Sequence, residues 1–299
     1  MNYNEFIKTI KETVNAKLGE GMEAIIIDVS KNNGIHLDGL IFRKSNPHEF
    51  AISPIFYLNE FYERRQDYNS LDEITEEIIS IYHEKRVSEA VFDNNIFSNF
   101  EKAKPKLYCK IINYDKNAAL LETVPHKRIL DLAVVVYYED EDDNETTLST
   151  LVSNNRIELW KTSIDDVIRV AASNTIKRSC KCVKIMELLT QFGCEKFCQD
   201  IDEEFPMFVL YSKEHKYGAV YFTFNHIMEA IAEKLQSDVI IFPSSIYEVI
   251  MVPYNSFEDL DAAKLLVRNI NKDYVNPEEV LSDNVYLYKR ELHELVLVN

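Results

Sequence analysis

Apolar residues recur at helical spacing in two stretches near the N-terminus. Four apolar residues from Phe6 to Leu18 stand four positions apart, and this period places their side chains on one face of an α-helix. Ser70 and Glu73 match a capping box ahead of a second such stretch. Helices are predicted over residues 5–18, 71–86, 153–160, 163–174, 225–235 and 256–271.

Other apolar runs predict β-strands. Residues 24–29 and 35–42 flank Asn33-Gly34, a pair that tolerates the positive φ angles of a type I′ turn, so they predict a β-hairpin. A break in the pattern is expected around residues 124–128, ahead of the next strand. Further strands are predicted at 106–113, 130–138, 207–211, 219–223, 238–242, 247–252, 285–288 and 295–298.

The order of these elements indicates the fold class. Strands joined by short turns, with helices between groups of strands, favour an α+β protein with mostly antiparallel sheets flanked by helices. We expect two packed lobes, an N-terminal one over residues 1–125 and a C-terminal one over 126–299, which could also form one continuous unit.

The composition and charge of the chain indicate which cellular compartment and which kinds of partner to expect. The formal net charge is −17, which repels phosphate backbones and argues against a nucleic-acid partner. The N-terminal residues lack the apolar core of a signal peptide, and the most apolar stretch, 132–138, is too short for a membrane span. Five cysteines, an odd number, fit reduced thiols. We therefore expect a soluble cytoplasmic protein without a membrane partner.

The glycines exclude the common nucleotide sites. The chain has only six glycines, whereas loops that hold phosphates need several of them close together. Gly34 and Gly39 have P-loop spacing, but Leu40 occupies the lysine position. We expect no cofactor.

Four cysteines in one region raise the question of a metal. Cys180, Cys182, Cys194 and Cys198 could supply the four thiolates of a zinc site. Their spacing matches no standard zinc motif, so the pattern favours structural thiols, with zinc as the alternative.

A few polar residues are candidates for catalysis if the fold brings them together. His126 opens a small basic cluster in an acidic chain and could bind an anion. Ser244, Ser245 and Glu248 lie around a turn between two apolar strands, and Asp283 lies in a later polar segment. The turn itself is the simpler explanation for the two serines. The chain contains no G-x-S-x-G motif.

Five distinctive segments of the sequence lie at residues 31–40, 53–59, 124–133, 242–249 and 280–286. They resemble an uncharacterised clostridial domain-of-unknown-function family, number 5688, and the resemblance covers nearly the whole chain. From about residue 130 the chain is also distantly similar to a second uncharacterised bacterial family. These resemblances imply a single module as long as the protein, in a bacterial cytoplasm, and they supply no catalytic residues.

These observations together favour a non-enzymatic protein-interaction or regulatory module with a protein partner of unknown identity. The missing motifs argue against the common enzyme classes, and the 17 tyrosines and 16 phenylalanines could furnish a binding surface. The alternative is an enzyme of unrecognised type, a hydrolase, that uses the polar groups named above.

Overall fold

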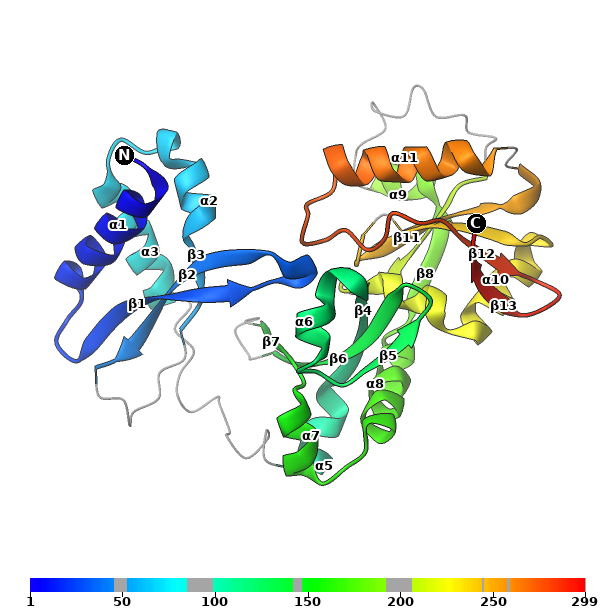
Figure 1. The fold of residues 1–299 in the computed structure, drawn as a ribbon, viewed down its shortest axis with the longest axis horizontal. Coiled ribbons are helices and arrows are strands. Elements are labelled where there is room, and N and C mark those ends of the chain that lie inside the picture. Colours follow the sequence, from blue (N-terminus) through cyan, green and yellow to red (C-terminus); the bar gives the residue numbers. More distant parts are fainter. Residues whose placement is uncertain are drawn as a thin grey trace. The chain divides into compact units, whose positions relative to one another are not determined.

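The computed structural model describes residues 1–45, 53–84, 99–141, 147–191, 206–243, 245–256 and 259–298. Contacts divide the chain into two compact units (Figure 1). The first comprises residues 1–31, 35–94 and 141–147, and the second comprises 32–34, 95–140 and 148–299.

The first unit is a three-stranded antiparallel sheet with helices on one face (Figure 1). The predicted apolar stripe of α1 is buried, with Phe6, Ile10 and Val14 fully covered, and Asn2 caps the helix through a capping box with Glu5. The elements are α1 (Tyr3–Lys17), β1 (Met22–Ser30), β2 (His36–Lys44), β3 (Phe56–Tyr57), α2 (Leu58–Glu63) and α3 (Leu71–Glu84).

The predicted hairpin is confirmed. Strands β1 and β2 pair in antiparallel register from Met22 opposite Lys44 to Ser30 opposite His36. Asn33 and Gly34 adopt φ angles of 60° and 68° at the turn. Both residues tolerate this left-handed conformation, which explains why the Asn-Gly pair predicts the turn correctly.

The second unit contains two sheets. The six-stranded sheet has the order β13-β12-β10-β11-β9-β8, with antiparallel neighbours. In the other sheet, β6 pairs with β4, β5 and β7. The strands are β4 (Leu107–Asn113), β5 (His126–Ile129), β6 (Leu132–Glu141), β7 (Thr147–Leu151), β8 (Cys180–Lys184), β9 (Phe208–Ser212), β10 (Val239–Phe242), β11 (Glu248–Pro253), β12 (Tyr286–Lys289) and β13 (Glu294–Leu297).

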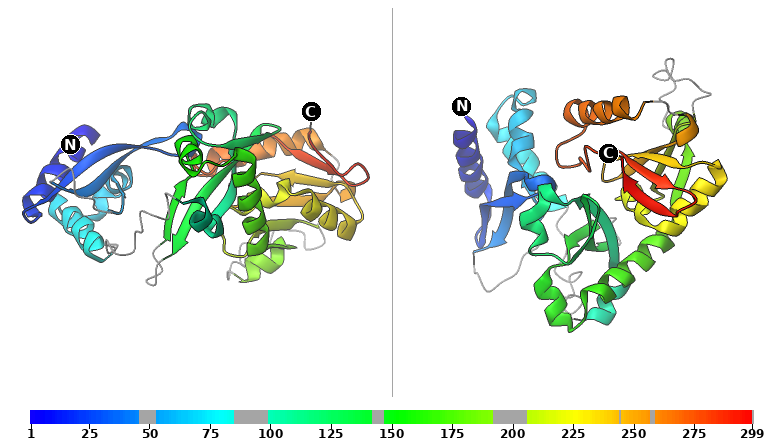
Figure 2. Two further views of the ribbon diagram at one scale, coloured as in Figure 1. Left: turned by 90° about the horizontal axis from the view of Figure 1, so that it is seen from below. Right: turned by 45° about the vertical axis from the view of Figure 1, so that its right-hand side comes forward.

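Helices cover both faces of the six-stranded sheet. Helix α11 packs on one face through Ala263 and Val267, next to Ile240 (Figure 2). The opposite face joins the largest core, which also takes in β4, β6, α8 and α10. The helices of this unit are α5 (Phe100–Ala103), α6 (Ala118–Leu121), α7 (Asn154–Trp160), α8 (Ile164–Arg178), α9 (Ile185–Gln191), α10 (Asn225–Leu235) and α11 (Leu260–Asp273).

The α+β class with mostly antiparallel sheets is thus confirmed, whereas the division into packed lobes at residues 125 and 126 stays a prediction. Within the described part of the chain, every helix is too short or too polar to cross a membrane.

Two predicted local structures are wrong. Residues 219–223 form part of a 3₁₀ helix (Gly218–Thr223) rather than a strand. Its residues are almost all buried, and a short segment buried on all sides has the same continuous apolar pattern as a buried strand. The predicted break at 124–128 contains β5, which pairs with β6 across a turn where Leu130 has φ 56°. Leucine at a left-handed position gives no turn signal.

Tyr221, which is buried, and Tyr247, which is half-buried, make the stability of the second unit sensitive to alkali. Burial is the main cause that raises the pKa of Tyr221 and of Tyr247, each to about 12. An unfolded tyrosine has a pKa of about 10. Above about pH 10 the unfolded chain therefore loses these protons first, and deprotonation favours unfolding.

We therefore expect the stabilisation from these tyrosines to be complete below about pH 10 and to be lost as the pH rises toward about 12. Urea unfolding at a series of pH values measures this, with absorbance at the phenolate band as a simultaneous readout. Tyr221→Phe is the control, because it removes one titrating group and should flatten the pH dependence. A urea concentration at the unfolding midpoint that stays constant above about pH 10 would contradict the expectation.

Candidate functional site

Asp131, in the turn between β5 and β6, is the centre of a hydrogen-bond cluster in the second unit. Its carboxylate accepts hydrogen bonds from the Ser282 hydroxyl at 2.7 Å, the Asn284 amide at 2.9 Å and the Tyr286 hydroxyl at 2.7 Å. Ser282 and Tyr286 are fully buried, and burial, followed by the charge of Asp131, raises the pKa of Tyr286. The cluster joins the turn to the segment that leads into β12.

The predicted candidates Asp283 and His126 lie near this cluster in sequence but have other partners. The Asp283 carboxylate accepts from the Asn271 amide at 2.9 Å and lies 3.5 Å from the Lys116 ammonium. Nδ1 of His126, on β5, lies 3.1 Å from the carbonyl oxygen of Val124. The structure therefore brings Asp131, rather than His126, to the polar segment that contains Asp283.

Ser245 and Glu248 are close together and close a turn between β10 and β11. The Ser245 hydroxyl donates to the Glu248 carboxylate at 2.8 Å and accepts from the backbone N–H of Tyr247 at 3.0 Å. Burial is the main cause that raises the pKa of the nearby Glu279 carboxyl, and the negative charges of Glu278 and Glu248 raise it further. This geometry is that of a polar turn. Ser244 lies outside the described residues, and catalysis by these groups stays a prediction.

Two of the four candidate zinc ligands are described. Cys180 and Cys182 lie two positions apart on β8, so their side chains share one face of the sheet. Burial raises the pKa of both thiols, that of Cys182 to about 11, which disfavours the thiolate form that binds zinc. Cys194 and Cys198 lie outside the described residues. No cluster of metal-binding side chains is found among the residues that are described, and zinc stays a prediction.

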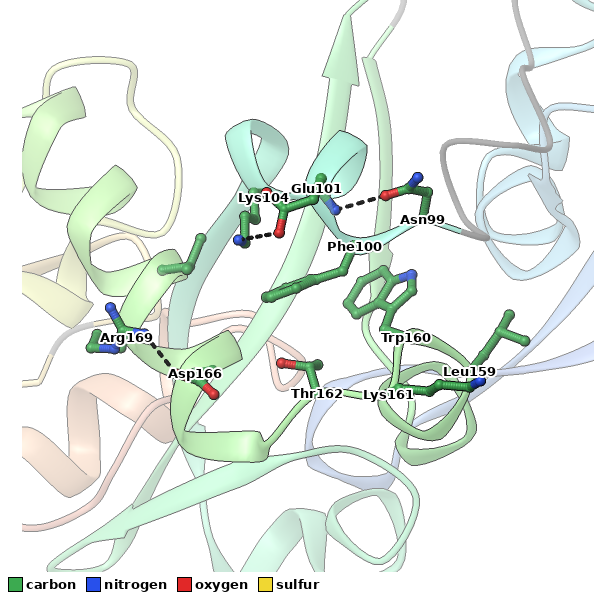
Figure 3. Close-up of a pocket in the computed structure, with 11 residues that line it drawn as sticks. Asn99, Phe100, Glu101, Lys104, Leu159, Trp160, Lys161, Thr162, Asp166 and Arg169 are labelled. Atoms are coloured by element: carbon green, nitrogen blue, oxygen red, sulfur yellow. Dashed lines mark hydrogen bonds and ion pairs between the residues drawn. The ribbon is translucent and has the colours of Figure 1, made fainter.

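A pocket of about 660 Å³ opens between α5, α7 and α8 of the second unit (Figure 3). The rings of Phe100, from α5, and Trp160, from α7, lie with their centroids 5.4 Å apart and form an apolar wall. Leu159 and Val170 also line the pocket, and Leu159 is 56% exposed. Leu159 and Lys161 are exposed at the mouth of this pocket, whereas Trp160 is only 8% exposed and belongs to the core of the second unit.

Local sequence signals explain how the α7–α8 junction shapes one side of the pocket. Helix α7 ends at Trp160, the following residue Lys161 adopts the left-handed conformation, and the N–H of Thr162 donates to the carbonyl of Ile157. These are features of a Schellman motif. Helix α8 then begins at Ile164, and its N-cap Ser163 accepts a hydrogen bond from the N–H of Asp166 through its hydroxyl. The short junction aims Lys161 and Thr162 at the pocket.

Ion pairs line the rim of the pocket (Figure 3). Lys104 donates to Glu101 at 2.5 Å, and Arg169 donates to Asp166 at 2.6 Å. The hydrogen bond from Arg169, followed by that from Ser163, lowers the pKa of the Asp166 carboxyl. Each of the two carboxylates is thus paired with a cation from the same helix or from the turn that follows it.

The sequence alone does not reveal this pocket, because its walls come from two stretches more than fifty residues apart in the chain. The available signal was the single tryptophan of the chain, Trp160, next to Leu159 at a helix end. Tryptophan is enriched at binding surfaces, but a buried structural tryptophan has the same sequence signature.

No curated protein and no solved structure matches the sequence significantly. The clostridial origin and the second family expected for the C-terminal part stay predictions. A family model does match residues 3–290, which is nearly the whole chain. The chain therefore belongs to the family of unknown function DUF5688.

Proposed function

We propose that this protein is a non-enzymatic protein-interaction module that holds a side chain of its partner in the pocket beside Phe100 and Trp160. The observation that carries the proposal is the combination of an aromatic wall with a charged rim in one open pocket. Interfaces commonly place most of their binding energy in such a desolvated aromatic pocket surrounded by polar contacts.

The rim suits recognition of a polypeptide. Its two carboxylates, Glu101 and Asp166, are each paired with a cation in the free protein, and exposed pairs of this kind contribute little stability. A partner can therefore rearrange them at small cost. Burying an aromatic side chain removes about 150–250 Å² from water, which is enough to anchor a short segment of chain.

The proposal includes a cytoplasmic location and a partner other than nucleic acid. The described cysteines, Cys109, Cys180 and Cys182, are free thiols, which suits a reducing compartment. The net charge of −17 argues against binding to a phosphate backbone.

Site-specific photo-crosslinking tests the proposal. A photoreactive amino acid in place of Leu159, which lines the pocket and is 56% exposed, should give a discrete crosslinked product in a lysate of the native organism. The matched control carries the same group at Leu292, which is 65% exposed and does not line this pocket. Adding Thr162→Trp to the Leu159 variant fills the pocket and should remove the product.

Two results would contradict the proposal. Equal crosslinking at positions 159 and 292 would indicate contact without a specific site. A product that persists in the Thr162→Trp variant, with an unchanged circular dichroism spectrum, would place the partner outside the pocket.

A further inference from the structure

The charges that line the pocket do not cancel. Lys104, Lys161 and Arg169 are the cations of the lining, and Glu101 and Asp166 are its anions. Two cations are paired with the two anions. This leaves an excess of positive charge at one place on a chain whose net charge is −17.

Lys161 carries that excess. Among the described residues, no carboxylate lies within ion-pair distance of its ammonium group. Lys161 is exposed, and its left-handed backbone at the end of α7 sets the direction of its side chain. Figure 3 shows this side chain along the wall opposite Phe100, near Leu159. An anionic group of a ligand can pair with Lys161 without displacing a carboxylate of the protein.

The apolar wall favours a particular kind of group next to the anionic group of such a ligand. The planes of Phe100 and Trp160 are inclined by 33°, and the Lys104 ammonium lies 4.8 Å from the centre of the Phe100 ring. Aromatic rings favour offset and edge-to-face contacts with further rings. A flat side chain therefore fits beside Trp160 better than a branched aliphatic one.

We propose that the pocket recognises an acidic peptide segment in which an aromatic side chain packs beside Phe100 and Trp160 and an adjacent carboxylate pairs with Lys161. This inference rests on the proposed function and names the chemistry of its partner.

The single tryptophan makes the test direct. Its indole N–H gives one resonance in a nitrogen-15 NMR spectrum of the full chain, and that resonance reports on the pocket. The probes are three capped tetrapeptides, Ala-Phe-Asp-Ala, Ala-Phe-Asn-Ala and Ala-Phe-Lys-Ala, titrated to about 10 mM, where a site with a dissociation constant of about 1 mM is nearly saturated.

We expect the aspartate peptide to shift the indole resonance and to bind about three- to fivefold more tightly than the asparagine peptide at low salt, as one exposed ion pair allows. The lysine peptide should bind most weakly, and added salt should reduce the differences. Lys161→Gln should remove the preference for aspartate, and Lys161→Glu should reverse it. Lys127→Glu, at an exposed site on β5, should change neither.

The outcomes separate the two proposals. Equal affinities for the three peptides, or a preference that persists in Lys161→Gln, would overturn the acidic partner and leave the binding pocket in place. An indole resonance that no peptide shifts would overturn binding in the pocket itself.

Discussion

Replacing Gly218 by alanine is expected to lower the free energy of unfolding of the second unit by more than about 3 kcal/mol. A Cβ at this position would lie 2.2 Å from the backbone nitrogen of Ser212 and 2.5 Å from the carbonyl oxygen of Tyr247. Both obstacles are backbone atoms, in β9 and in the residue just before β11, so a rotamer change cannot relieve the clash. Relief requires moving a strand or the 3₁₀ helix within a tightly packed core.

The fluorescence of Trp160 during urea unfolding measures this effect, because the single tryptophan lies in the second unit. Gly19→Ala is the control: a Cβ there meets no atom within 4 Å, so the substitution should change stability by less than about 1 kcal/mol in the far-ultraviolet circular dichroism transition. A Gly218→Ala protein with an unchanged Trp160 transition would show that β9 and β11 do not constrain this position.

Gly218 also shows which parts of the fold are predictable from the sequence. Helix α1 and the hairpin of β1 and β2 are specified locally, by an apolar period of four and by Asn33-Gly34. The 3₁₀ helix from Gly218 to Thr223 depends on how closely two strands approach the glycine. That distance is a property of the tertiary packing and leaves no periodic signal in the segment itself.

The candidate site shows the same division. The sequence singles out Asp283, Ser245 and Glu248 because polar residues in turns stand out from apolar strands. The pocket depends on Phe100 and Trp160 meeting across sixty positions of the chain. Neither residue belongs to a motif, so only the fold reveals that they line one cavity.

Asp131→Ala is expected to destabilise the second unit by about 3–5 kcal/mol, because it removes the acceptor of three hydrogen bonds at once. The hydroxyl groups of Ser282 and Tyr286 are fully buried and would lose this acceptor in a place where water cannot readily replace it. Urea unfolding followed by Trp160 fluorescence and by circular dichroism measures the loss.

Asp283→Ala is the matched control, one residue from the donor Ser282. The Asp283 side chain is 45% exposed and lies 3.5 Å from Lys116, and its other partner, Asn271, keeps a hydrogen bond to the Ser282 carbonyl. Its removal should cost less than about 1 kcal/mol. If Asp283→Ala were the more damaging variant, the segment before β12 would depend on Lys116 and Asn271 rather than on Asp131. If Asp131→Ala is the more damaging, the cluster holds the β5–β6 turn to that segment, and its polar groups serve the fold while binding is left to the open pocket.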